Sequence, residues 1–193
     1  MTLEQAESAL IELNPQPFYV PLGKWAPIVE GAFTGMSARH WIFAGPRSRI
    51  GATLRGAKPQ RVLNPEDGAK PYKIAPSSHH PARRALHAVG SALATRQPTL
   101  CILGDAALAS GEFHQALSVS VQYQCPTTFL VIRHPLTDDA PVSKQYTTSI
   151  KSIAQSLGMQ YQHVSAQKET IETAVQHAAE SLLPYLIETT LEK

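Results

Sequence analysis

The sequence predicts an α/β fold with a doubly wound parallel sheet. From residue 81 onward, short apolar segments typical of strands alternate with longer segments typical of helices. The apolar segment Thr99–Leu103 runs directly into Gly104 and Asp105, and a further helix follows. Regular alternation of strands and helices is the pattern of βα units, which build parallel sheets.

The amino-terminal part of the chain contains two predicted helices and one strand. The segment Thr2–Leu13 is rich in Glu and Ala and ends before an Asn-Pro pair, so we expect a helix there. Three prolines in segment 15–21 predict a linker or arm over the surface. A proline near its start suits the first turn of a second helix, Trp25–Met36, and the strand Trp41–Ala44 follows.

The segment Lys58–Pro81 is predicted to be a long loop, because it carries five prolines and few apolar residues. Loops of this length in compact domains are usually functional or mobile. His79 and His80 lie at its end, where an imidazole could supply acid–base chemistry or a metal ligand. The alternative is a polar loop end before a helix.

The rest of the chain continues the alternation. A second loop, Pro135–Tyr146, contains two adjacent aspartates and is expected at the same sheet edge as Asp105. Further helices are expected at Pro81–Ala94, Gly111–Tyr123, Thr147–Leu157 and Lys168–Leu182. Further strands are expected at Thr127–Ile132, Gln160–Val164 and Tyr185–Thr189.

The turn at Gly104 and Asp105 is the candidate ligand site of the sequence. The carboxyl end of a strand and the amino end of a helix meet in such a turn, so backbone N–H groups and the helix dipole favour an anion. Asp105 could hold a divalent cation that bridges to a phosphate. The alternative is an ordinary βα turn in which Asp105 caps the helix.

Several segments recur in the same order in one known family. They are the Gly-Asp turn with its helix and Pro-led strand, Trp-Ile-Phe-Ala-Gly-Pro-Arg at 41–47, Leu-Arg-Gly at 54–56, Gly-Ser-Ala-Leu-Ala at 90–94, the helix at 150–159 and Leu-Ile-Glu at 186–188. On these segments, residues 23–188 resemble the alpha subunit of thiamine diphosphate-dependent 2-oxo acid dehydrogenases, the E1 component of pyruvate and branched-chain type. The resemblance implies the thiamine diphosphate-binding fold, with a helix and arm over 1–22 and a single E1-alpha-like domain over 23–193.

The resemblance also implies a cofactor, a site and a partner. The cofactor would be thiamine diphosphate with a divalent cation, and the chemistry would be decarboxylation of a 2-oxo acid. The chain would be part of a homo- or hetero-oligomer, in which an E1-beta-like subunit completes the active site. The implied cofactor contacts are Arg47, Gly104, Asp105, Ala106 and Ala107. The implied metal ligands are Asp105, His134 and Leu136.

The chain departs from the family pattern at several of these positions. His134 stands where the family carries a metal-binding Asn, Ala106 replaces the last Gly of Gly-Asp-Gly, Pro46 replaces a Tyr, and Trp25 replaces an acidic residue. Mg²⁺ and Ca²⁺ prefer oxygen ligands, so Asp105 with His134 is a poorer site for a hard cation. The chain therefore resembles a shortened E1-alpha subunit with a degenerate cofactor motif. The alternative to a cofactor half-site is a non-catalytic pseudoenzyme, without cofactor, that keeps the fold as a structural or regulatory subunit.

Composition restricts the other classes of function. With 193 residues, of which 43% are hydrophobic, the chain can bury one core. The net charge of +2 does not favour nucleic acid, and no apolar run approaches the roughly 18 residues of a membrane span. The amino terminus lacks the parts of a signal peptide, so a cytoplasmic location is expected. An ordinary Rossmann-like nucleotide domain is disfavoured because the chain has no G-x-G-x-x-G motif.

Cysteines and basic residues give weaker signals. The two cysteines, Cys101 and Cys125, lie in apolar surroundings and are expected to be buried free thiols. A local excess of Arg and Lys predicts a solvated basic face, with a surface for phosphates or an acidic partner as the alternative. The basic residues concerned are Arg39, Arg47, Arg49, Arg55, Lys58, Arg61, Arg83 and Arg84.

Overall fold

The computed structural model describes residues 1–13, 20–63, 70–76, 80–134 and 149–191. Within these residues, five strands form one parallel sheet in the order β1-β2-β3-β5-β4, which confirms the predicted α/β class. The strands are β1 (Trp41–Phe43), β2 (Thr99–Gly104), β3 (Thr127–Arg133), β4 (Gln160–Val164) and β5 (Tyr185–Thr190). No helix among the described residues is long and apolar enough to cross a membrane.

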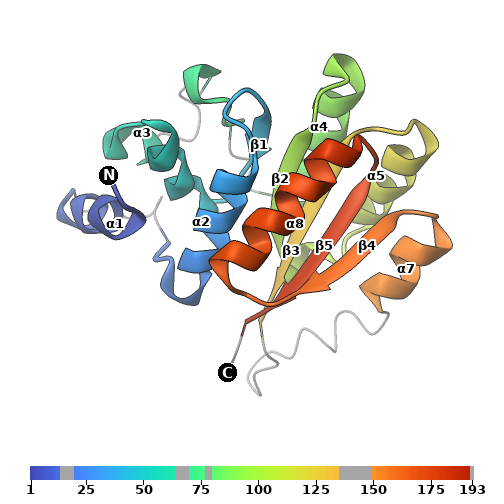
Figure 1. Cartoon of the computed structure of the whole chain (residues 1–193). Helices are drawn as coiled ribbons and strands as arrows, with labels where there is room; N and C mark the ends of the chain where they lie inside the picture. The colour runs from blue at the N-terminus through green and yellow to red at the C-terminus, as the bar shows by residue number, and fades with distance from the viewer. Residues whose placement is uncertain (14–19, 64–69, 77–79, 135–148, 192–193) are drawn as a thin grey trace.

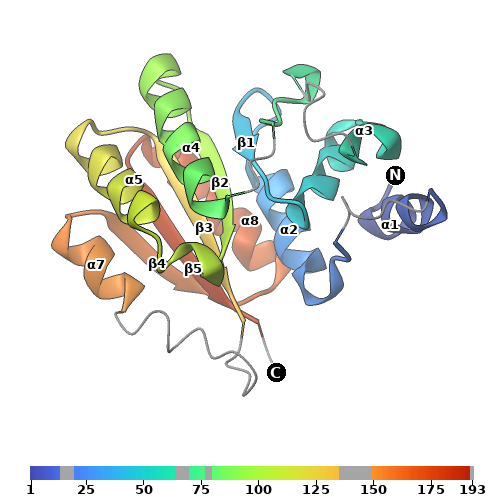
Figure 2. The same ribbon diagram turned by 180° about the vertical axis from the view of Figure 1, so that it is seen from behind.

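Helices cover both faces of the sheet (Figures 1 and 2). Helices α2 (Ala26–Gly35) and α8 (Lys168–Ser181) lie on one face, and α4 (Pro81–Thr95), α5 (Gly111–Gln122) and α7 (Ile150–Ser156) lie on the other. The strand order explains this division, because parallel connections are almost always right-handed. The path from β1 to β2, β3 and β4 moves one way across the sheet, whereas the step from β4 to β5 moves back, so α8 packs on the opposite face from α4, α5 and α7.

Two hydrophobic cores follow from the alternation of side chains along the central strands. Leu100 and Ile102 of β2 pack into the core beneath α2 and α8, whereas Cys101 and Leu103 pack into the core beneath α4 and α5. Helix α1 (Leu3–Glu12) joins the first core, since Leu3, Ala6 and Leu10 on one side of it are buried. The proposed division of the chain at residue 22 stays a prediction.

The prediction of one long loop over Lys58–Pro81 is wrong for part of that segment. Helix α3 (Pro59–Leu63) and a 3-10 turn, η3 (Lys70–Tyr72), lie within it, and Ile74 forms a parallel bridge to Ile42 of β1. Proline at a first helical position favours a helix start, and the burial of Val62 provides the packing that so short a helix needs. Residues 77–79, which include His79, lie outside the described part.

The prediction of a solvated basic face is also wrong for three of its arginines. Arg49 and Arg84 are 3% and 5% exposed, and they donate to the carbonyls of Ala75 and Ile102 at 3.0 and 2.9 Å. Arg55 reaches four carbonyls, those of Met36, Ser37, His40 and Tyr72, at 2.9–3.1 Å. Apart from Ile102 in β2, the residues that carry these carbonyls lie outside the five strands. A guanidinium has enough donors to bind several carbonyls at once.

Helices α2 and α8 approach each other closely at two glycines of α2. A Cβ on Gly31 would collide with the carbonyl oxygen of Lys168, and a Cβ on Gly35 would lie 2.5 Å from the carbonyl oxygen of Glu172. The glycines are one helical turn apart, so together they form a flat surface against which the α8 backbone packs. This contact fixes the position of α2 along the sheet.

We expect Gly31→Ala to lower the free energy of unfolding by about 1–3 kcal/mol, because the new methyl group overpacks a backbone contact. Gly90→Ala is the matched control. Gly90 is an exposed glycine of α4 with nothing within 4 Å of the added Cβ, so its replacement should stabilise the helix by up to about 1 kcal/mol. Urea unfolding measures both, and equal effects of the two substitutions would contradict the close contact.

Both thiols should resist modification in the native protein. Cys101 and Cys125 are fully buried free cysteines, and burial raises the pKa of Cys101 to about 12 and raises that of Cys125. Because the thiolate is the reactive form, Ellman's reagent at pH 8 should modify neither thiol until the protein is unfolded, and both afterwards. Rapid modification of a native thiol would show that one of these environments is open.

Candidate ligand site at the carboxyl edge of the sheet

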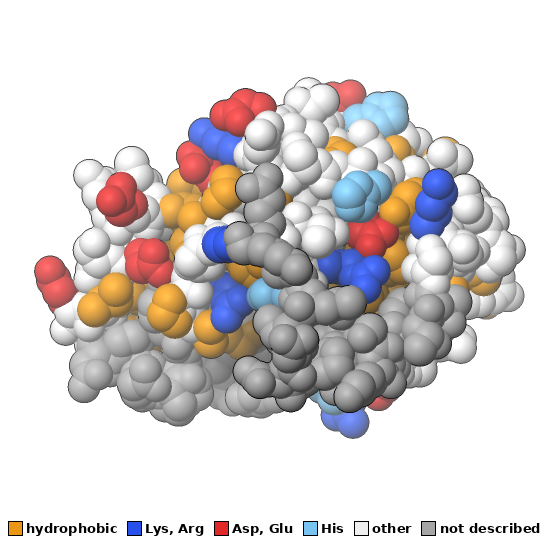
Figure 3. Space-filling view, turned by 90° about the horizontal axis from the view of Figure 1, so that it is seen from below, with side chains coloured by type: hydrophobic (Ala, Val, Ile, Leu, Met, Phe, Trp, Pro, Cys, Tyr) orange, Lys and Arg blue, Asp and Glu red, His pale blue; other side chains and the backbone are white. Residues whose placement is uncertain are grey.

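The ends of three neighbouring strands bring the candidate residues together. Strand β2 leads into the 3-10 turn η4 (Asp105–Ala107), and β3 leads into His134. The parallel register pairs Gly104 with Ile132, so Asp105 and His134 leave their strands side by side. Figure 3 views this edge from below and shows Lys, Arg and His side chains gathered near its centre, with an acidic side chain among them.

His134 supplies the partners of the Asp105 carboxylate. The side-chain oxygen Oδ2 of Asp105 accepts a hydrogen bond from the backbone N–H of His134 at 3.0 Å and lies 3.4 Å from ring atom Nδ1 of the same residue. Asp105 is 9% exposed and makes no side-chain cap of η4, whose N-cap position is Gly104. The capping alternative is therefore not what the structure shows, because the carboxylate is used to join two strand ends.

Trp25 contacts both His134 and the turn at Gly104. It ends the 3-10 turn η1 (Gly23–Trp25), and its indole N–H donates to Nε2 of His134 at 3.2 Å. The ring atom Cη2 is 3.6 Å from the position that a Cβ on Gly104 would take. The indole is 8% exposed, so the space against the Gly104 backbone is filled by a side chain of the protein itself.

Arg47 completes the cluster from the segment after β1. Its guanidinium carbon lies 5.1 Å from the centre of the Trp25 ring, a cation–π contact, and its Nη1 is 3.4 Å from Nε2 of His134. The side chain is half-buried, so it still has donors that face solvent. We call Trp25, Arg47, Asp105 and His134 the edge network.

The edge network leaves His134 without a free lone pair. An indole N–H can only donate, so Nε2 of His134 is the acceptor. In the neutral ring the proton is then on Nδ1, which faces Asp105. A metal ion binds the lone pair of an imidazole nitrogen, so it would have to break the contact with Trp25 or with Asp105. Among the described residues, no group of three or more His, Cys, Asp or Glu could hold a metal ion.

The remaining predicted site residues are placed as follows. Gly104 is half-buried and Ala106 is exposed at the turn. Ala107 is buried, so only its backbone could contact a ligand. His80 is exposed and directly precedes α4. His79 and Leu136, like the adjacent aspartates of the second loop, lie outside the described residues. The structure thus brings Arg47, Asp105 and His134 together, and their roles toward a cofactor or metal stay predictions.

Sequence reasoning missed a second carboxylate at this edge. Glu188 of β5 is 7% exposed, and its oxygens accept from Nη1 of Arg133 at 3.1 Å and from the Tyr161 hydroxyl at 2.6 Å. Burial and this hydrogen bond raise the pKa of Tyr161. Trp25 was also missed as a site residue. The available signal was that Trp25 stands at a position where the resembled family has an acidic residue.

Comparisons with known proteins agree with this geometry at the level of the fold. No family model matches the chain. Two curated relatives, the 3-methyl-2-oxobutanoate dehydrogenase subunit alpha of Mycobacterium tuberculosis strains CDC 1551 / Oshkosh and H37Rv, are each 35% identical to it over 85 residues. The match covers 42% of this chain and 23% of each relative, so the chain spans less than a quarter of the relatives' length.

Solved structures resemble the chain over a larger part of its length. A thiamin diphosphate-dependent enzyme of Mycobacterium smegmatis matches with a TM-score of 0.52 and 22% identity, over 64% of this chain and 25% of that one. Transketolase from Campylobacter jejuni gives 0.59 and 14%, over 83% and 30%, and transketolase from Leishmania mexicana gives 0.62 and 15%, over 83% and 29%. The chain therefore has the α/β fold of thiamine diphosphate-dependent, transketolase-like enzymes.

His134→Ala should lower the free energy of unfolding by about 1–2 kcal/mol, since it leaves the buried indole N–H of Trp25 without its acceptor and removes the ring beside Asp105. His163→Ala is the control, because His163 is exposed on β4, and it should change stability by less than about 0.5 kcal/mol. Urea unfolding compares the two. Equal stability of the two variants would show that the edge network does not stabilise the fold.

Proposed function

We propose that the chain is an E1-alpha-like subunit that keeps the thiamine diphosphate-binding fold for a structural or regulatory role and does not supply a working cofactor half-site. The observation that carries this proposal is the set of contacts made by the ring and the backbone N–H of His134. Its acceptor nitrogen takes the indole N–H of Trp25, and its other ring nitrogen and backbone N–H face Asp105. Two of the three residues that the family resemblance assigns to a metal, Asp105 and His134, are thus partners of one another.

A diphosphate would also have to compete with side chains of this chain. The indole of Trp25 lies against Gly104, where a phosphate would approach the turn, and Arg47 lies over that indole. Binding would require Trp25 to move, which breaks one hydrogen bond and one cation–π contact and exposes a nearly buried ring. Each of these losses costs about 1 kcal/mol or more, so the closed arrangement opposes the cofactor.

A second candidate is the cofactor half-site itself, and the exposure of Arg47 favours it. Arg47 keeps donors toward solvent at the carboxyl edge, next to Asp105 and the exposed turn residue Ala106. In this case Arg47 and the turn at Gly104–Ala107 would hold the diphosphate of thiamine diphosphate, which supplies the nucleophilic carbanion for 2-oxo acid decarboxylation when bound. Asp105 would be the remaining oxygen ligand for a divalent cation.

For both candidates we propose that the chain is part of an oligomer and that it is cytoplasmic. The curated relatives are named as alpha subunits, which supports an assembly with further subunits. An E1-beta-like chain or a second copy of this chain would be the partner.

The two candidates differ in what thiamine diphosphate does to stability. We expect no change in the unfolding midpoint of the purified chain with thiamine diphosphate at millimolar concentration, in Mg²⁺ or in Mn²⁺. Tryptophan fluorescence gives a second readout. In the variant Trp41→Phe, Trp25 is the remaining tryptophan of the sequence. Its emission should not change when the variant is titrated with thiamine diphosphate.

A rise of several degrees in the midpoint would contradict the structural role, because a ligand of the native state stabilises it by mass action. Asp105→Asn then serves as the decisive control. Loss of the rise in this variant, together with a cofactor-dependent change in Trp25 emission, would establish the half-site at the turn.

A further inference from the structure

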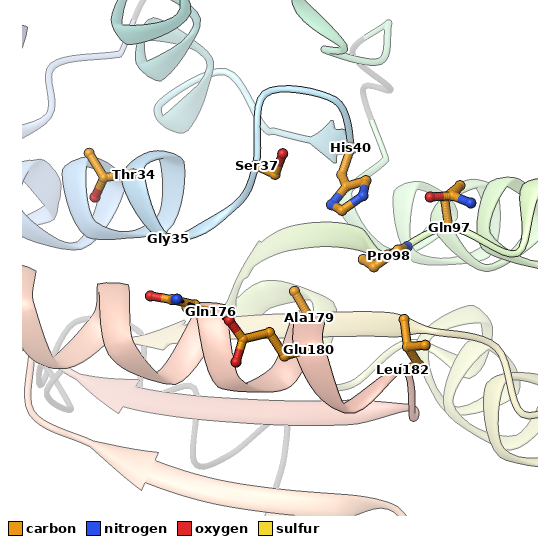
Figure 4. Close-up of a pocket in the computed structure, with 10 residues that line it drawn as sticks. All are labelled: Thr34, Gly35, Ser37, His40, Gln97, Pro98, Gln176, Ala179, Glu180 and Leu182. Atoms are coloured by element: carbon orange, nitrogen blue, oxygen red, sulfur yellow. Dashed lines mark hydrogen bonds between the residues drawn. The ribbon is translucent and has the colours of Figure 1, made fainter.

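A pocket opens at the amino edge of the sheet, at the opposite end of the strands from Asp105 (Figure 4). It lies between the last two turns of α8, the end of α2 with the turn that leads to β1, and the residues that join α4 to β2. Its volume is about 490 Å³, which is within the range of small-molecule sites. The pocket is lined by Thr34, Gly35, Ser37, His40, Gln97, Pro98, Gln176, Ala179, Glu180 and Leu182.

The pocket exists because α8 continues past the end of α2. The two helices touch at Gly31 and Gly35, opposite the first part of α8, and α2 ends at Gly35. The chain then turns toward β1, while α8 continues to Ser181. The space beside the last turns of α8 is therefore bounded by a turn instead of a helix.

The wall formed by this turn is rigid. Arg55, which does not line the pocket, donates to the carbonyls of Met36, Ser37 and His40. Its guanidinium also lies 5.6 Å from the ring centre of Phe33 in α2. A wall held by several charge-assisted hydrogen bonds is pre-organised for a ligand, because little ordering remains to be done on binding.

The lining offers hydrogen-bond acceptors, whereas several of its donors are already used. The Thr34 hydroxyl donates to backbone carbonyls of its own helix, and the side-chain amide of Gln176 donates to Oε1 of Glu180 at 3.0 Å. Atom Nδ1 of His40 is buried and has no hydrogen-bond partner among the described residues. Burial, with Arg39 and Arg55 nearby, lowers the pKa of His40. Because Nδ1 is also shielded from the pocket, the carboxylate of Glu180 is the charged acceptor that the lining offers to a ligand.

The charge of the lining has one sign. Glu180 is the single acidic side chain among the lining residues, which include no Lys or Arg, and the carboxyl end of α8 adds the negative end of a helix dipole. Arg39 and Arg55 lie near His40, but neither lines the pocket. Pro98, Ala179 and Leu182 provide apolar surface beside these acceptors.

We infer that this pocket binds a small organic cation that carries several N–H donors, of the amidine or alkylammonium class. The cationic head would pair with the carboxylate of Glu180, and the apolar part would lie against Pro98 and Leu182. The inference does not depend on the role proposed for the carboxyl edge, since the two sites share no residue.

Benzamidine is the probe, and benzamide, which has nearly the same shape without the charge, is the matched ligand control. Isothermal titration calorimetry of the full chain at pH 7.5 should give a benzamidine Kd of about 1 mM or lower, as expected for so small a ligand. Benzamide should bind at least about tenfold more weakly, because the charge-assisted hydrogen bond is lost.

Two substitutions on α8 test the position of the site. Glu180→Gln keeps an acceptor for Gln176 but removes the charge, and it should weaken benzamidine binding by about tenfold. Glu169→Gln makes the same change at the exposed start of α8, outside this pocket, and should leave the affinity unchanged. No benzamidine binding at millimolar concentration, equal binding of benzamide, or equal losses in the two variants would each overturn the inference.

Discussion

The hydrogen bond from the backbone N–H of His134 to the carboxylate of Asp105 joins the ends of β3 and β2, and the rest of the carboxyl edge depends on it. A carboxylate that is 9% exposed must find its donors within the protein, because water reaches little of it. Meeting that requirement with the backbone of His134 also holds the imidazole beside Asp105. The ring then presents Nε2 to Trp25, and the indole closes over Gly104.

Two consecutive residues at the end of β3 contact two buried acidic side chains. Arg133 pairs with Glu188, and His134 pairs with Asp105. Successive side chains of a strand point to opposite faces of the sheet, so one strand end can reach acids on both. If Arg133 or His134 moved away, a nearly buried carboxylate would lose hydrogen-bond donors, which costs free energy. Both pairs therefore stabilise the position of β3 relative to its neighbouring strands.

The parts of this structure that follow from local pattern could be predicted, and those that follow from tertiary packing could not. Alternating apolar segments predicted the parallel sheet, and the order of βα units placed Asp105 and His134 at one edge. The burial of Arg84 could not be predicted, because the sequence shows its charge but not its hydrogen bond to the carbonyl of Ile102 in β2. The contact of Trp25 with His134 joins residues 109 positions apart, and no local signal reports such a distance.

Helix α2 connects the two edges of the sheet. Trp25 directly precedes its first turn, and Gly35 at its end lines the pocket at the opposite edge. Between them, the glycine contact with α8 leaves no room for α2 to slide or rotate without a backbone collision. A ligand that enters at Gly104 must therefore displace the Trp25 side chain or the short turn η1, and it cannot do so by moving the helix. For the same reason, occupancy of the pocket at the far end of α2 is not expected to open the carboxyl edge.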